Sequence, residues 1–63
     1  MNQQAIKTVK QGEYIKRKQD AKKVYIRGEY CRISKAYSCT DADDINREIF
    51  IKGDKLVFVG FEY

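Results

Sequence analysis

The side chains best suited to binding chemistry are the basic and tyrosine residues of the first 37 positions. This stretch holds ten of the thirteen Lys and Arg residues but only three of the nine Asp and Glu residues. Lysine and arginine contact phosphates and tyrosine rings stack on bases, so the combination is typical of nucleic-acid binding. The alternative is an ordinary solvated basic surface, because a binding footprint requires that the charges gather on one face. The candidate nucleic-acid-binding residues are Lys16, Arg17, Lys18, Lys23, Tyr25, Arg27, Tyr30 and Arg32.

A second candidate surface lies at the C-terminal end, in residues 55–63. Alternate positions are apolar on both sides of this segment, with Val57 and Val59 on one side and Leu56 and Phe58 on the other. A strand that is apolar on both faces is central in a sheet, wraps around a barrel or meets a partner chain. The alternative to a partner is that a small core needs all of these side chains. The candidate residues for binding a protein partner or a second copy are Leu56, Phe58, Phe61 and Tyr63.

Catalytic constellations are missing from the sequence. The chain contains no histidine, which removes the usual general base near neutral pH and any Ser-His-Asp or Cys-His set. The four glycines are scattered and form no phosphate-binding motif. A chain of 63 residues has little room for both a packed core and a deep catalytic pocket. We therefore expect a protein that is not an enzyme and that uses no cofactor.

Metal ligands are equally sparse. Two cysteines, Cys31 and Cys39, cannot supply the four soft ligands of a structural zinc site. The three aspartates within 41–44 depart from the EF-hand calcium pattern, because Asn46 and Lys52 occupy the positions of its glycine and its final glutamate. We interpret these aspartates as turn and capping residues and expect no metal.

Composition predicts a folded, non-membrane protein. Hydrophobic residues make up 43% of the chain and aromatic residues 13%, and proline is absent. No apolar run approaches the roughly 20 residues that span a bilayer. The N-terminus lacks the basic and apolar regions of a secretory signal, so we expect a cytoplasmic location, where disulfides are rare.

The elements that would position these residues are mostly strands. Residues 1–11 form a lead-in that is either a short helix or irregular, although Ile6–Val9 also has the composition of a short strand. Residues 12–63 form a single β-rich domain, in which Gly28 marks a bulge and Gly53–Asp54 a hairpin turn. The pattern of alternating side chains predicts extended structure over residues 13–18, 23–27, 29–33, 36–40, 47–52 and 55–63.

The cysteines fall in the hairpin expected between residues 29 and 40. A three-residue loop would place Cys31 directly opposite Cys39, whereas a two-residue loop would offset them. A redox-active pair is one hypothesis, since Arg32 and Lys35 provide an electropositive setting. The other is that each cysteine is a small hydrophobic residue of the core.

Three runs of sequence resemble short uncharacterised β-rich proteins encoded by bacteriophages and prophages, namely Val24–Tyr30, Asp44–Phe50 and Val57–Phe61. This resemblance implies an origin and carries no mechanism with it. The run Gly12–Ile15 is similar to the first strand of SH3-like barrels.

The fold expected is mostly β: an antiparallel meander of about five strands that closes toward a small SH3-like barrel, with a short N-terminal helix as one option. The function expected is a small binding module without enzymatic activity, with nucleic acid as its target. The alternative is a phage- or prophage-type protein-interaction factor, or a homodimer, acting through an edge strand or the C-terminal apolar face.

Overall fold

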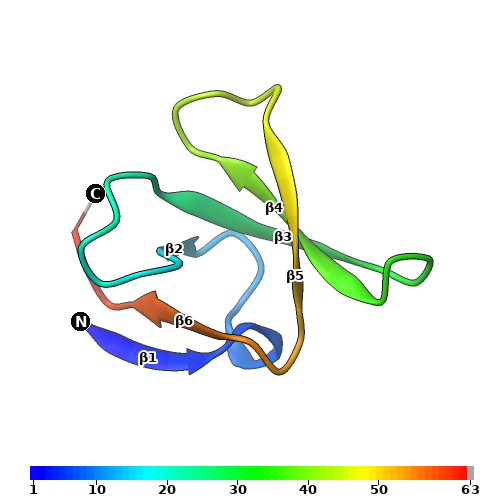
Figure 1. Ribbon diagram of the computed structural model, residues 1–63, viewed down its shortest axis with the longest axis horizontal. Helices are drawn as coiled ribbons and strands as arrows, with labels where there is room; N and C mark the ends of the chain where they lie inside the picture. The colour runs from blue at the N-terminus through cyan, green and yellow to red at the C-terminus, as the bar shows by residue number, and fades with distance from the viewer. Residues whose placement is uncertain (63) are drawn as a thin grey trace.

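The computed structural model of the protein, which describes residues 1–62, is built mainly of antiparallel strands (Figure 1). This confirms the mostly β fold expected from the alternating pattern. Within these residues there are six strands and one turn of 3-10 helix, η1. In chain order the elements are β1 (Asn2–Ala5), η1 (Ile6–Thr8), β2 (Tyr14–Ile15), β3 (Tyr25–Cys31), β4 (Ala36–Asp41), β5 (Glu48–Lys52) and β6 (Leu56–Val59).

The strands form two sheets that curl toward each other. One is four-stranded in the order β2-β3-β4-β5, and the other pairs β1 with β6. Lys16 and Phe58 join the two sheets, since each backbone amide donates to the other residue's carbonyl, at 2.9 Å and 2.8 Å. The Ile6 amide donates to the carbonyl of Lys55 at 2.9 Å and so extends the pairing of β1 with β6 by one residue. The four-stranded sheet is curled into a half-barrel that the second sheet partly closes (Figure 1).

The core fills the inside of this half-barrel. In β5 the inner residues Ile49 and Ile51 pack against or within the core, while Phe50 between them is 49% exposed on the outer face. This is the period-two burial of a strand with one solvated face. The core cluster consists of Ile6, Val9, Ile15, Tyr25, Cys39, Ile51, Val57 and Val59.

The N-terminal lead-in contains a short helical turn, as one of the expected forms did, but a strand that the sequence does not predict precedes it. Residues 2–5 are a strand, with Asn2 opposite Val59 and Ala5 opposite Leu56, and the chain then makes a single 3-10 turn that brings Ile6 into the core. The segment is polar and has no strand pattern of its own. Residues 2–5 are extended because they pair with β6. The backbone groups of β6 need hydrogen-bond partners on both sides of the strand, and β1 supplies them on one side.

The predicted strand over residues 13–18 is much shorter than expected. Tyr14 and Ile15 pair with Ile26 and Tyr25 of β3, and the next residue, Lys16, turns to pair with Phe58 of β6. The segment therefore serves as a corner between the two sheets.

The Gly53–Asp54 prediction is only partly met. The chain turns there, with the amide of Lys55 donating to the carbonyl of Lys52 at 2.9 Å. It does not form a hairpin, because β6 leaves β5 and pairs with β1. The outer edge of β5 consequently has no neighbouring strand among residues 1–62.

The β3–β4 hairpin contains the expected bulge at Gly28. The register shifts between Arg27 and Tyr30, so that Arg27 lies opposite Cys39 and Tyr30 opposite Tyr37. The Ser38 backbone approaches position 28 so closely that it leaves no room there for a side chain.

The same hairpin separates the two cysteines. Cys31 lies opposite Ala36, which makes the loop four residues long, and Cys39 lies opposite Arg27 further along the strand. Both thiols are free, and Cys39 belongs to the core. Burial raises the pKa of the Cys39 thiol to about 11, whereas hydrogen bonds from Ser34 lower the pKa of the Cys31 thiol. The register does not make them a redox pair.

Candidate nucleic-acid interface

A groove of about 450 Å³ runs along the outer edge of β5, between that strand and the loop that follows β2. Arg17 and Lys18 enter it from the loop, and Lys52 and Lys55 enter it from the end of β5 and the turn after it. Asp54 is the one acidic residue of its lining, and Ile49, Phe50, Ile51 and Val57 supply apolar surface.

A second depression, of about 360 Å³, continues from the first around the same loop. It shares Arg17 and Lys18 with the first, and it adds Lys22 and Lys23 together with Ala21 and Tyr25. The basic residues of the two depressions therefore form a continuous surface. We call this surface the cationic groove and define it by Arg17, Lys18, Lys22, Lys52 and Lys55.

The loop that carries Arg17, Lys18 and Lys22 of this surface is fixed at both ends. Lys16 is bonded to β6 through its backbone, and the ammonium of Lys23 lies 3.3 Å from a carboxylate oxygen of Asp41. Within the loop, the amide of Ala21 donates to the carbonyl of Lys18 at 3.1 Å. The loop thus presents Arg17 and Lys18 to solvent from a defined position, and both side chains are exposed.

Several predicted nucleic-acid-binding residues are occupied by contacts within the fold. The ammonium of Lys16 lies 4.8 Å above the Phe61 ring, and Lys23 is paired with Asp41. Tyr25 is only 8% exposed and belongs to the core. Tyr25 therefore belongs to the interior, whereas the Lys23 side chain, although paired, stays 53% exposed beside the second depression.

Arg27 and Tyr30 lie together elsewhere, on the β3–β4 hairpin. The Arg27 guanidinium stacks 4.1 Å from the centroid of the Tyr37 ring, and Tyr30 meets the same ring edge-on at 5.1 Å. Arg32 follows β3 at the tip of this hairpin, which projects on the side away from the loop between β2 and β3 (Figure 1). Of the eight predicted residues, the structure brings Arg17 and Lys18 into the cationic groove and leaves Arg27, Tyr30 and Arg32 outside its lining.

The predicted partner-binding residues differ in how exposed they are. Leu56 is 50% exposed, while Phe58 and Phe61 are partly buried. Tyr63 lies outside the described residues. β6 lies between β1 and Lys16, which pairs with Phe58, and its inward residues Val57 and Val59 belong to the core.

Three residues of the groove were not among the sequence candidates, namely Lys22, Lys52 and Lys55, and Phe50 lines it as well. Phe50 could have been found from the period of two, because it alternates with Ile49 and Ile51 and must face outward when they face inward. No local pattern connects Lys52 and Lys55 with Arg17, since only the fold places them together.

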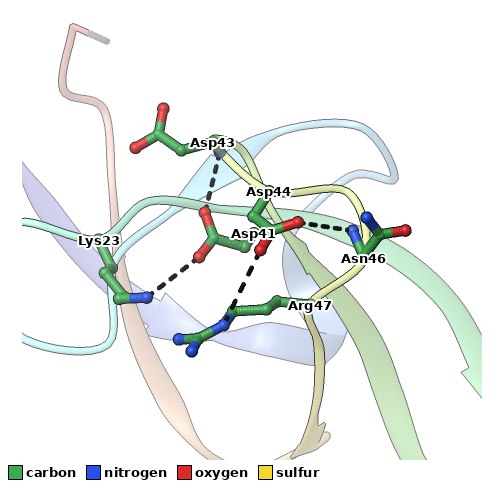
Figure 2. Close-up of polar contacts among 6 residues, drawn as sticks. All are labelled: Lys23, Asp41, Asp43, Asp44, Asn46 and Arg47. Carbon is green, nitrogen blue, oxygen red and sulfur yellow. Dashed lines mark hydrogen bonds and ion pairs between the residues drawn. The ribbon is translucent and has the colours of Figure 1, made fainter.

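The aspartates at the end of β4 and directly after it build a turn, as expected (Figure 2). One carboxylate oxygen of Asp41 accepts the amide of Asp43 at 2.9 Å, and Asp44 accepts the amide of Asn46 at 3.0 Å. The Arg47 guanidinium lies 3.9 Å from Asp44. Within residues 1–62 no group of three or more possible ligands is placed to hold a metal ion.

The charge on Asp41 stabilises the folded state. Asp41 is only 3% exposed, and the hydrogen bond from the Asp43 amide, followed by the contact with Lys23, lowers the pKa of its carboxyl. A carboxyl whose pKa is lower in the folded than in the unfolded chain contributes stability above its unfolded pKa, and that contribution is lost as pH falls through the folded pKa.

We therefore expect the melting temperature to fall as pH is lowered from about 5 toward 2, and Asp41→Asn to flatten this dependence. Circular dichroism melts over that range measure it. Asp20→Asn, in the exposed loop after β2, is the matched control and should retain the slope of the native protein. Parallel curves for the native protein and Asp41→Asn would contradict the role given to this carboxylate.

In comparisons with known proteins, no family model, no curated sequence and no solved structure matches this chain. In the part of the chain that the structure describes, no helix has the length and apolar character needed to cross a membrane. The cationic groove is therefore the feature of the molecule that bears most directly on function.

Proposed function

We propose that the protein is a small binding module without enzymatic activity that takes up nucleic acid, in single-stranded form, along the cationic groove. The observation that carries the proposal is the convergence of Arg17 and Lys18 with Lys52 and Lys55 on one groove, opposed by Asp54 alone. Basic residues from two distant segments meet there, which is the clustering that a scattered basic surface lacks.

The groove offers two kinds of contact to a single strand. Its Lys and Arg side chains are suited to successive phosphates, and releasing the counterions of those phosphates supplies most of the binding free energy. Phe50, 49% exposed in the lining, offers a ring face to a base. Neither contact depends on sequence, so we expect weak discrimination between sequences.

The first test is the salt dependence of binding to a fluorescently labelled single-stranded oligonucleotide, followed by anisotropy. Four phosphate contacts predict that the logarithm of the association constant falls against that of salt with a slope of about −3. Absence of binding at low salt would overturn the proposal.

Paired charge reversals locate the site. Arg17→Glu with Lys18→Glu should weaken binding by at least about tenfold, because two attractive contacts become repulsive. Arg32→Glu with Lys35→Glu makes the same change of charge at the tip of the β3–β4 hairpin and should cost much less. Equal losses from the two pairs would mean that net charge alone, and no particular groove, attracts the nucleic acid.

The proposal includes a cytoplasmic setting, which is supported by two cysteines that the register keeps apart as free thiols. The resemblance to phage and prophage proteins stays a prediction about its origin. The alternative function, binding to a protein, is supported by the unpaired outer edge of β5.

A further inference from the structure

The outer edge of β5 presents backbone groups that no described strand uses. β5 is the last strand of its sheet, and within residues 1–62 only β4 pairs with it. The amide of Asp41 donates to the carbonyl of Arg47 at 3.0 Å, so Arg47 and the odd-numbered residues of β5 are those that face β4. Because hydrogen-bonding direction alternates along an antiparallel strand, Glu48, Phe50 and Lys52 direct their backbone groups outward.

This edge lacks two of the devices that block pairing with another chain, a proline and a β-bulge. It contains no proline, and the register of β4 with β5 is regular from Ala36 opposite Lys52 to Thr40 opposite Glu48, without a bulge. Phe50, at its centre, is 49% exposed. A regular strand edge with an exposed aromatic residue is a template for strand addition.

The sequence of β5 is complementary to itself. Antiparallel pairing with a second copy centred on Phe50 places Glu48 opposite Lys52 of the other chain, twice over by symmetry. Phe50 then lies opposite Phe50, and Ile49 opposite Ile51. Opposite charges and aromatic pairs across strands are both favourable, and each hydrogen-bonding residue on one edge meets a hydrogen-bonding residue on the other.

We propose that the protein forms a two-fold symmetric dimer in which β5 pairs antiparallel with β5 of a second copy. The pairing joins two four-stranded sheets into one continuous sheet. A second copy suits this edge better than an acidic peptide does, because a peptide that complements Lys52 meets the like charge of Glu48. An isologous contact of this kind also closes on itself and does not propagate into a fibre.

The dimer goes beyond the proposed function and uses one wall of the same groove. β5 lines the cationic groove, so a second copy and an oligonucleotide compete for its edge. The experiment is therefore performed without nucleic acid, and its failure would leave the proposed binding of nucleic acid unaffected.

Sedimentation equilibrium over a concentration series that reaches about 1 mM tests the dimer. The native protein should show a reversible monomer–dimer equilibrium. Glu48→Lys makes the edge wholly basic and Lys52→Glu makes it wholly acidic, and each should weaken self-association by at least about tenfold, because like charges then lie directly opposite. Lys55→Glu makes the same change of charge as Lys52→Glu just beyond β5, and it should associate as the native protein does.

Two combinations of these variants should restore association, which separates a loss of pairing from a loss of folding. The double variant Glu48→Lys with Lys52→Glu should associate as the native protein does, and an equimolar mixture of the two single variants should form a mixed dimer. Circular dichroism verifies that each variant is folded. A native protein that stays monomeric, a dimer that ignores both single variants, or a mixture that fails to associate would each overturn the β5 pairing.

Discussion

Ile6→Ala is expected to lower the free energy of unfolding by about 2–5 kcal/mol and to lower the melting temperature sharply. The Ile6 side chain is fully buried, and η1 inserts it into the core where the two sheets meet. Truncating a buried isoleucine to alanine typically costs about 2–5 kcal/mol, because the cavity collapses only in part. A domain of this length has about 3–9 kcal/mol of total stability, so one truncation consumes a large share of it.

Thermal and urea unfolding followed by circular dichroism measure the effect. Ile33→Ala is a matched control, since it makes the same chemical change at a side chain that is 95% exposed, and it should change stability by no more than about 0.5 kcal/mol. If Ile6→Ala melted with the control, η1 would not be the element that closes the core.

Gly28→Ala is expected to destabilise the β3–β4 hairpin by about 1–3 kcal/mol, the range for forcing extra atoms into a filled space. A Cβ at this position would lie 2.7 Å from the carbonyl oxygen of Ser38. That oxygen belongs to the backbone of the paired strand, so it cannot rotate away as a side chain would. The bulge has to shift or the ladder has to open.

Gly53→Ala is the control for this substitution. The nearest atoms to a Cβ there are side-chain carbons of Lys7 and Tyr37, both at 3.4 Å, and Gly53 is not among the residues with positive φ. We expect a change within about 0.5 kcal/mol. Backbone chemical shifts of Gly28→Ala should move along Arg27–Cys31 and around Ser38, and unperturbed shifts there would contradict the close approach.

The bulge also decides which side chains meet on the hairpin. If the register of Arg27 opposite Cys39 continued without it, Glu29 would lie opposite Tyr37. The shift instead places Tyr30 there, and this produces the edge-to-face contact of Tyr30 with Tyr37. The sequence predicts that Gly28 interrupts the strand, but the size of the interruption follows from how β4 approaches it.

Prediction from sequence succeeded where the residues of a strand are themselves typical of extended structure. Strands β3 to β6 are rich in aromatic and β-branched residues, and in β5 and β6 more exposed and more buried positions alternate. It failed for β1, whose residues are Asn, Gln, Gln and Ala. Residues 2–5 form a strand because their backbone hydrogen-bonds to β6. A polar segment does not show by its own sequence that another strand will pair with it.

The sequence by itself determined the class of fold, the bulge at Gly28 and the concentration of basic residues before position 38. These follow from the period of side chains along an extended backbone, from the absence of a Cβ and from composition, all of which are local. The tertiary structure alone decided where the candidate side chains lie: it pairs Lys23 with Asp41, encloses Tyr25 in the core, and brings Arg17 and Lys18 together with Lys52 and Lys55. Charges interact through space, and the distance between them depends on strand order and register, which a linear pattern does not contain.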